Sequence, residues 1–140
     1  MKKKIAIIGS TGSIGKTLFD IVSKDINKFE VKLLTANSSH KTILNQAKKL
    51  NVKNLIITNK NSYELLKKKT RHTNIKIFNN FEELDKIFKN KIDYIMSSIT
   101  GIEGLYPTLK TIKFTKKIAI ANKESIICGW NLIKKELKKN

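Results

Sequence analysis

The sequence predicts an α/β fold in which a doubly wound, mostly parallel sheet is covered by helices on both faces. Short runs rich in β-branched residues alternate along the chain with longer amphipathic stretches, which is the pattern of repeated strand–helix–strand units. A glycine-rich segment follows the first of these short runs directly. With 140 residues, of which 40% are hydrophobic, the chain can bury a core and has the length of one domain.

Six segments are predicted to form strands because they are short, apolar and bounded by polar or turn-forming residues. The first contains four consecutive apolar residues, Ile5 to Ile8, as expected for a strand that is buried on both faces of a parallel sheet. Right-handed crossovers between the strands then give the doubly wound arrangement. The predicted strands are residues 4–8, 31–35, 54–58, 76–78, 93–96 and 117–121.

The stretches between and after these strands are predicted to be helices because their apolar residues recur at helical spacing. In the first helix the predicted inward face carries Ile14, Leu18, Ile21 and Val22, and in the second it carries Ile43, Leu44, Ala47 and Leu50. The single proline, Pro107, lies early in its helix, where its missing N–H costs little. The predicted helices are residues 13–24, 41–50, 63–69, 81–88, 103–114 and about 125–138.

The strong positive charge does not by itself indicate a nucleic-acid partner. The formal net charge is +18, but nearly all of the 29 basic residues are lysines scattered along the chain, and Arg71 is the single arginine. Proteins that recognise nucleic-acid bases or bind phosphate groups through two hydrogen bonds favour arginine. We therefore expect no nucleic-acid partner and attribute the lysines to an A/T-biased genome. The positive electrostatic field of the lysines would still attract anionic ligands. No apolar run approaches membrane-span length, and the N-terminus lacks signal-peptide features, so we expect a cytoplasmic protein without a membrane partner.

The end of the first predicted strand has the features of a phosphate-binding loop. Gly9, Gly12 and Gly15 are spaced Gly-x-x-Gly-x-x-Gly between a strand and a helix, the context of the loop in Rossmann-like NAD(P)-binding folds. Gly9 would allow a sharp turn, Gly12 would let the backbone approach a pyrophosphate, and Gly15 would let the helix pack closely on the strand. The alternative is a glycine-rich turn without a ligand. The spacing does not fit a P-loop of kinases or ATPases.

The end of the second predicted strand favours NADPH over NADH. An NAD site usually places an acidic residue there to bind the ribose 2′-hydroxyl, but no acidic residue occurs between Glu30 and Glu64. The segment 36–41 instead offers hydrogen-bond donors and a cation, with no charge that would repel a 2′-phosphate. An alternative reading is a polar loop that caps the next helix through Ser38 or Ser39.

The end of the last predicted strand carries three polar residues of different charge, Asn122, Lys123 and Glu124, followed by Ser125. A ribose and a phosphorylated substrate beside a nicotinamide would need such a mixed set of donors, acceptors and charges. Helix initiation is an equally open interpretation, with Asn122 as the N-cap and Glu124 in the first turn.

Taken together, three motifs resemble those of the 1-deoxy-D-xylulose 5-phosphate reductoisomerase family. They are Gly-Ser-Thr-Gly-Ser-Ile-Gly over residues 9–15, the Gly-x-x-Gly-Leu-x-Pro-Thr-Leu segment over residues 101–109, and Ala-Asn-Lys-Glu-Ser over residues 121–125. The motifs occur in family order and at family spacing, and the resemblance covers essentially the whole chain. The first motif alone would not be specific, but the three together are.

The resemblance also implies roles for particular residues. It assigns the cofactor pyrophosphate to Thr11, Gly12, Ser13 and Ile14, and the adenosine ribose with its 2′-phosphate to Asn37, Ser38 and Ser39. Many family members have Gly-Lys-Asn at these last three positions, so the missing cation would have to come from Lys41. Two further NADPH contacts are implied at Asn122 and Glu124, and a substrate contact at Lys123.

The activity implied by the resemblance is conversion of 1-deoxy-D-xylulose 5-phosphate to 2-C-methyl-D-erythritol 4-phosphate, a step of isoprenoid-precursor synthesis. It uses NADPH and a divalent cation, Mn²⁺, Mg²⁺ or Co²⁺, that polarises the substrate carbonyl, and the family is usually homodimeric. We expect residues 1–129 to form an NADPH-binding domain and residues 130–140 to begin the connection to a catalytic domain. The family's metal ligands follow the segment matching residues 134–140, so this chain is expected to bind NADPH without turning over substrate.

Two other functions fit parts of the pattern. Another NADP-dependent oxidoreductase, of the homoserine or aspartate-semialdehyde dehydrogenase type, would explain the glycine loop and the fold but not the Asn-Lys-Glu-Ser motif. A non-enzymatic, basic nucleotide-binding module would explain the charge, but the chain contains no RNA- or DNA-binding motif and almost no arginine.

Overall fold

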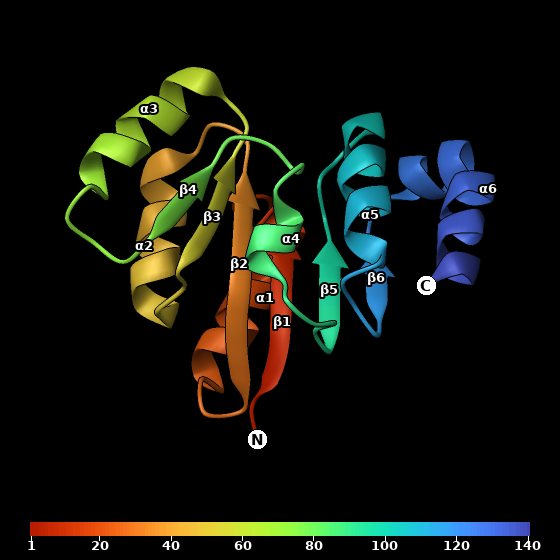
Figure 1. The fold of residues 1–140 in the computed structure, drawn as a ribbon, viewed down its shortest axis with the longest axis horizontal. Helices are drawn as coiled ribbons and strands as arrows, with labels where there is room; N and C mark the ends of the chain where they lie inside the picture. Colours follow the sequence, from red (N-terminus) through yellow and green to blue (C-terminus); the bar gives the residue numbers. More distant parts are fainter.

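The computed structural model describes residues 1–140 as a six-stranded sheet in which every neighbouring pair of strands is parallel (Figure 1). The strand order is β4-β3-β2-β1-β5-β6, so the chain builds outward from β1 in one direction and then crosses back to β1's other side. This confirms the predicted doubly wound parallel sheet. The strands are β1 Lys3–Ile8, β2 Phe29–Ala36, β3 Asn54–Ile57, β4 Lys76–Phe78, β5 Tyr94–Ser97 and β6 Ile118–Ile120.

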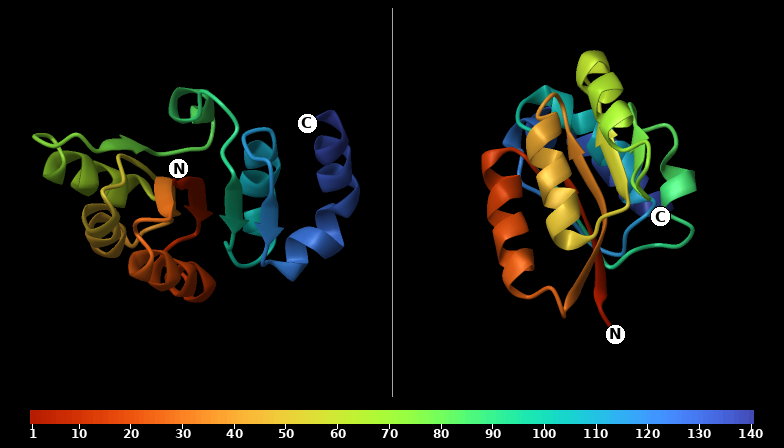
Figure 2. Two further views of the ribbon diagram at one scale, coloured as in Figure 1. Left: turned by 90° about the horizontal axis from the view of Figure 1, so that it is seen from below. Right: turned by 90° about the vertical axis from the view of Figure 1, so that its left-hand side faces the viewer.

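Helices cover both faces of this sheet (Figures 1 and 2). Helices α1, α2 and α3 lie on one face and α4 and α5 on the other, while α6 packs against α5 beyond the β6 edge. A short 3₁₀ turn, η1, connects β5 to α5. The helices are α1 Ser13–Lys24, α2 His40–Leu50, α3 Lys60–Lys69, α4 Leu84–Ile87, α5 Leu105–Ile112 and α6 Lys123–Lys139, and η1 is Ile102–Gly104.

The central strand β1 contributes to two separate hydrophobic cores, one on each face of the sheet. Ile5 and Ile7 pack with α1, α2 and α3, whereas Ala6 and Ile8 pack with the segment around α4. Side chains alternate between the two faces of a strand, so the uninterrupted apolar run of β1 is required for burial on both sides. This confirms the sequence-based interpretation of that run.

The inward face of helix α1 matches only in part the one that its apolar pattern predicts, with Leu18 packed against the core as predicted. The helix buries Gly15, Phe19 and Val22, while Ile14 and Ile21 of the predicted face remain about half exposed. The reason is the contact of Gly15 with the loop before the helix, because a Cβ on Gly15 would lie only 2.1 Å from the Gly9 carbonyl oxygen. This close approach fixes the rotation of the helix and turns residues spaced four and seven positions after Gly15 inward.

The helix boundaries follow capping more closely than apolar periodicity. Helix α3 begins at Lys60, before the predicted start at residue 63, because the Asn59 side chain accepts a hydrogen bond from the Ser62 N–H. Helix α4 is reduced to Leu84–Ile87, since Asn80 accepts from the Glu82 N–H and holds the preceding residues in a turn. The predicted domain division after residue 129 falls inside α6, which is continuous, and that division stays a prediction.

A carboxylate ties three segments together at the amino-terminal edge of the sheet. Asp93, just before β5, accepts hydrogen bonds from the backbone N–H of Lys4 at 2.9 Å and from the Lys116 ammonium group at 2.8 Å. The Lys116 hydrogen bond is the main reason that the pKa of Asp93 lies below its ordinary value of 3.8, and the Lys4 N–H lowers it further.

This depressed pKa predicts an acid-dependent loss of stability. Ionised Asp93 favours the folded state at every pH above its unfolded pKa, near 4, and this contribution disappears as the pH falls toward the lower folded value. The free energy of unfolding of Asp93→Asn, measured in urea between pH 2.5 and 7, should therefore fall below that of the parent at neutral pH. The difference should shrink below pH 4. A difference that stayed constant over the whole range would contradict this assignment.

Candidate functional site

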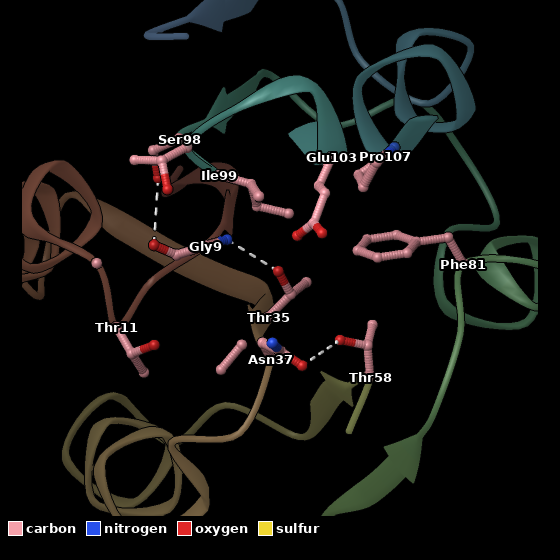
Figure 3. A pocket seen from close by; sticks show the side chains of 13 residues that line it. Gly9, Thr11, Thr35, Asn37, Thr58, Phe81, Ser98, Ile99, Glu103 and Pro107 are labelled. Carbon is pink, nitrogen blue, oxygen red and sulfur yellow. Dashed lines mark hydrogen bonds between the residues drawn. The ribbon is translucent and has the colours of Figure 1, made fainter. Parts of the chain in front are cut away.

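A pocket of about 420 Å³ lies over the carboxyl ends of the strands, beside the point where the strand order reverses between β1 and β5 (Figure 3). Open parallel sheets bind their ligands at such a position. Thirteen residues line it, and they come from loops that are distant in the sequence. They are Gly9, Thr11, Gly12, Thr35, Ala36, Asn37, Thr58, Phe81, Ser98, Ile99, Thr100, Glu103 and Pro107.

The three glycines of the loop after β1 have distinct structural roles. Gly9 has φ of +87°, a backbone conformation that favours glycine, and Gly15 allows the close helix contact described above. Gly12 differs, because a Cβ there would meet only the Gly9 carbonyl oxygen at 3.6 Å, an ordinary contact. Packing within the protein therefore explains Gly9 and Gly15 but leaves the glycine at position 12 unexplained. Gly12 borders the pocket, so the space next to it is available to a ligand.

The loop is held by polar side chains of β2, of α2 and of the residue that follows β5. Ser10 is fully buried; its hydroxyl donates to Gln46 Oε1 at 2.7 Å, and the Gln46 amide donates back to the Ser10 carbonyl at 2.9 Å. From β2, Thr35 Oγ1 accepts from the Gly9 N–H at 2.8 Å, and on the opposite side of β1 the Ser98 hydroxyl donates to the Ile8 carbonyl at 2.8 Å. The backbone that faces the pocket is therefore fixed before any ligand arrives.

The N-terminus of α1 borders the pocket at Gly12. Gly12 is the N-cap residue, no side chain caps it, and the first turn contains no acidic residue. The positive end of the helix dipole is thus not neutralised by the protein itself. Such an end binds anionic groups, phosphates above all.

The loop after β2 contributes polar groups that the protein leaves available. The Thr58 hydroxyl donates to Asn37 Oδ1 at 3.1 Å, which leaves the Asn37 amide nitrogen without a partner in the chain. Ser39 is the N-cap residue of α2, but its side chain forms no capping hydrogen bond, and Ser38 contributes only its carbonyl, to Ser62 Oγ and the His40 N–H. The alternative interpretation, in which Ser38 or Ser39 caps the helix through its side chain, is therefore wrong.

The Asn122 side chain, in contrast, is fully engaged inside the protein. Its Oδ1 accepts from the Ser125 N–H at 2.8 Å as the N-cap of α6, and its Nδ2 donates to the carbonyls of Ile99 and Gly101. Only 4% of the residue is exposed. Gly104 makes room for it, because a Cβ on Gly104 would lie 2.6 Å from Asn122 Nδ2. The helix-initiation interpretation is confirmed for this residue.

The next two residues have free side chains. Lys123 is exposed and Glu124 is partly exposed, and neither belongs to any of the seven ion pairs of the chain. Since Asn122 is bonded to the loop after β5, both residues begin α6 close to that loop. Lys123 and Glu124 therefore offer an unpaired cation and an unpaired anion at the carboxyl edge of β5 and β6.

Comparison with known proteins identifies the family. The sequence profile described as 1-deoxy-D-xylulose 5-phosphate reductoisomerase matches residues 5–129. The chain belongs to the 1-deoxy-D-xylulose 5-phosphate reductoisomerase family. A reductoisomerase of Pelagibacter ubique is 58% identical over 139 residues, which cover 98% of this chain and 36% of that protein. The enzyme of Wolbachia pipientis from Culex pipiens is 39% identical over 137 residues, with 97% and 35% covered. The chain thus spans about a third of the length of these relatives.

Solved reductoisomerase structures share the fold. The Zymomonas mobilis enzyme in complex with NADPH superposes with a TM-score of 0.88 at 28% identity, covering 99% of this chain and 37% of that one. A reductoisomerase in complex with NADPH, fosmidomycin and magnesium superposes with a TM-score of 0.86 at 28% identity, covering 98% and 34%. These likenesses confirm the expected family and displace the semialdehyde dehydrogenase alternative.

Of the site residues expected for a reductoisomerase, the pocket brings together Thr11, Gly12 and Asn37. The remaining ones do not line it, although Asn122 is bonded to the backbone of Ile99, which does. Sequence reasoning did not identify several lining residues, among them Thr58, Phe81 and Glu103. Thr58 and Phe81 follow β3 and β4. Their position just after a predicted strand was the one feature of the sequence that could have indicated a place in the site.

Within residues 1–140, no group of three or more His, Cys, Asp or Glu side chains could hold a metal ion. No helix has the length and apolar character needed to cross a membrane.

The Ser10–Gln46 pair gives a first test of the loop's support. Gln46→Leu removes both hydrogen bonds and leaves the buried Ser10 hydroxyl with only the longer bond to the Thr35 carbonyl, at 3.3 Å, which should lower the free energy of unfolding by about 1–3 kcal/mol. Asn45→Leu, at an exposed neighbouring position of the same helix, is the matched control and should change it by less than about 0.5 kcal/mol. Equal urea-unfolding midpoints for the two variants would mean that the pair does not stabilise the loop.

The Asn122 bonds give a second test. Asn122→Ala removes the α6 cap and frees the Ile99 and Gly101 carbonyls, so we expect a loss of about 1–3 kcal/mol in the free energy of unfolding. Hydrogen exchange should locate the effect, with faster exchange of the Ser125 N–H and unchanged protection in β2 and β3. Uniformly faster exchange throughout the sheet would contradict a local role.

Proposed function

We propose that this chain forms the NADPH-binding part of an enzyme that converts 1-deoxy-D-xylulose 5-phosphate to 2-C-methyl-D-erythritol 4-phosphate. Family membership supports the reaction, and solved relatives were obtained with NADPH. The structural observation that carries the cofactor assignment is Gly12, which borders open space at an uncapped helix N-terminus. Neither local strain nor packing requires a glycine there, whereas a pyrophosphate lying against the backbone would.

The pyrophosphate is proposed to lie against the first turn of α1. Thr11, Ser13 and Ile14 would present backbone N–H groups and two hydroxyls to it, with the helix dipole favouring its negative charge. Gly12, whose own N–H donates to the Gly9 carbonyl at 3.3 Å, would let the pyrophosphate approach the backbone. The polar bonds to Gln46, Thr35 and Ser98 keep this backbone in place, so little ordering would be needed on binding.

The adenosine 2′-phosphate is proposed to bind at Asn37, Ser38 and Ser39. All three residues are exposed, and the two serine hydroxyls and the Asn37 amide nitrogen are not used within the protein. The loop contains no carboxylate that would repel the phosphate, and Lys41 in the first turn of α2 is an exposed cation. These features favour NADPH over NADH.

The end of β6 is proposed to serve the reacting half of the cofactor and the substrate. The Glu124 carboxylate can accept hydrogen bonds from ribose hydroxyls, and the Lys123 ammonium group can bind a phosphorylated substrate. Asn122 would support the cofactor site by holding the Ile99–Gly101 backbone, because its own side chain is already fully bonded. Its role in this proposal is therefore positioning.

A divalent cation is the one expected component for which residues 1–140 offer no cluster of ligands. Magnesium is present in three of the related structures. The homodimeric state and the cytoplasmic location implied by the resemblance stay predictions.

The proposal is tested by titrating the 140-residue chain with NADPH and with NADH, following binding by calorimetry. We expect NADPH to bind at least about tenfold more tightly, and Gly12→Val to weaken NADPH binding at least about a hundredfold. The reason is that the new side chain would occupy the space of the pyrophosphate. Far-ultraviolet circular dichroism of Gly12→Val should be unchanged.

Thr17→Val, on the exposed side of the second turn of α1, is the matched control and should bind NADPH like the parent. Normal NADPH binding by folded Gly12→Val would overturn the phosphate-loop assignment. Equal affinities for NADPH and NADH would overturn the role of the Asn37–Ser39 loop while leaving the phosphate loop intact.

A further inference from the structure

Glu103 is an acidic side chain of the pocket that the function proposed above does not use. It lies in η1, lines the pocket, and points its carboxylate toward the space between Ile99 and Phe81 (Figure 3). Lysine outnumbers acidic residues more than twofold in this chain, and seven of its 11 acidic residues form an ion pair with lysine. Glu103 forms neither an ion pair nor a side-chain hydrogen bond, so its acceptor oxygens are free.

The walls around this carboxylate suit a flat, partly polar ring. Phe81 is almost fully buried in the core beneath α4 and presents its ring to the pocket beside Pro107. The Ile99 side chain adds an apolar surface, and the Asn37 amide nitrogen supplies one free donor. The pocket therefore combines apolar walls with a hydrogen-bond acceptor and a hydrogen-bond donor that come from different loops.

The position of Glu103 relates it to one half of the cofactor. In sheets of this type the pyrophosphate lies at the first helix N-terminus and the adenosine lies over the end of the second strand. Here that end is Asn37, and beyond it the pocket continues between Thr58 and Phe81 on one side and Ile99 and Glu103 on the other. Given the proposed function, the adenine base lies in this part of the pocket.

We propose that Glu103 determines which base the dinucleotide carries, by accepting a hydrogen bond from the 6-amino group of adenine. This rests on the function proposed above. A carboxylate is an acceptor only, and Glu103 is the only ionisable side chain that lines the pocket. Hypoxanthine and guanine carry a carbonyl oxygen at the same ring position, which would face the carboxylate without a proton between them. A carboxylate beside an anionic cofactor repels it, so the hydrogen bond to the base is what makes this residue favourable here.

The experiment compares NADPH with its reduced hypoxanthine analogue, in which the 6-amino group is replaced by a carbonyl oxygen. The parent chain should bind NADPH at least about tenfold more tightly than the analogue, as expected for a hydrogen bond to a charged acceptor. In Glu103→Gln the amide can donate as well as accept, so the two affinities should agree within about twofold. Comparing two ligands on one protein cancels the general effect of removing a negative charge.

Glu64→Gln is the matched control, because Glu64 is an exposed carboxylate on α3 that also forms no ion pair. It should retain the parent's preference for NADPH. An unchanged preference in Glu103→Gln, with NADPH binding intact, would overturn the role of Glu103 and leave the cofactor assignment standing. If the parent chain bound neither dinucleotide, the cofactor assignment would fail, and the role of Glu103 would fail with it.

Discussion

The contact between Gly15 and the backbone of Gly9 and Ser10 is the constraint on which the site depends. It exists only because position 15 has no side chain, since a Cβ would lie 2.1 Å from one backbone oxygen and 2.7 Å from the Ser10 Cα. The contact brings the first turn of α1 directly against the end of β1. It also sets the rotation of the helix, which decides that Phe19 and Val22 enter the core. The local geometry of one loop thus determines both the orientation of the phosphate-binding turn and the packing of the first helix.

Hydroxyl groups at the strand ends serve mainly the protein itself. Thr35 and Ser98 hold the glycine loop, and Ser97 bonds to Thr108 of α5 at 2.7 Å inside the protein. Strand ends rich in small polar residues therefore indicate where a site lies without indicating which residues touch the ligand. Among the residues that line the pocket, the Asn37 amide nitrogen and the Glu103 carboxylate are polar groups that form no hydrogen bond within the protein. A chain of net charge +18 lines its pocket with no lysine at all, so its positive field acts on anions from a distance.

The sequence alone could predict those structural features that depend on the local pattern of residues. Apolar runs and glycine spacing predicted the parallel sheet, the position of β1 and the loop at Gly12, because these features depend on neighbours in the chain. The inward face of α1 was predicted correctly at Leu18 and Val22 but not at Ile14 and Ile21, since the rotation of the helix depends on a glycine contact that apolar periodicity does not register. Phe81 and Glu103 could not be assigned to the pocket, because they meet only when β4 and β5 take their places on opposite sides of β1. Asn122 had two open interpretations, and only its three hydrogen-bond partners distinguish them.

Those three hydrogen bonds also have a mechanical consequence. Asn122 joins the first turn of α6 to the backbone at Ile99 and Gly101, and this backbone leads directly into η1, which carries Glu103. A tilt of α6 about its first turn would therefore pull on the wall of the pocket, and a ligand pressing on that wall would push on the helix. The amide group of a single buried side chain works as a linkage between the longest helix of the chain and the shape of its ligand pocket.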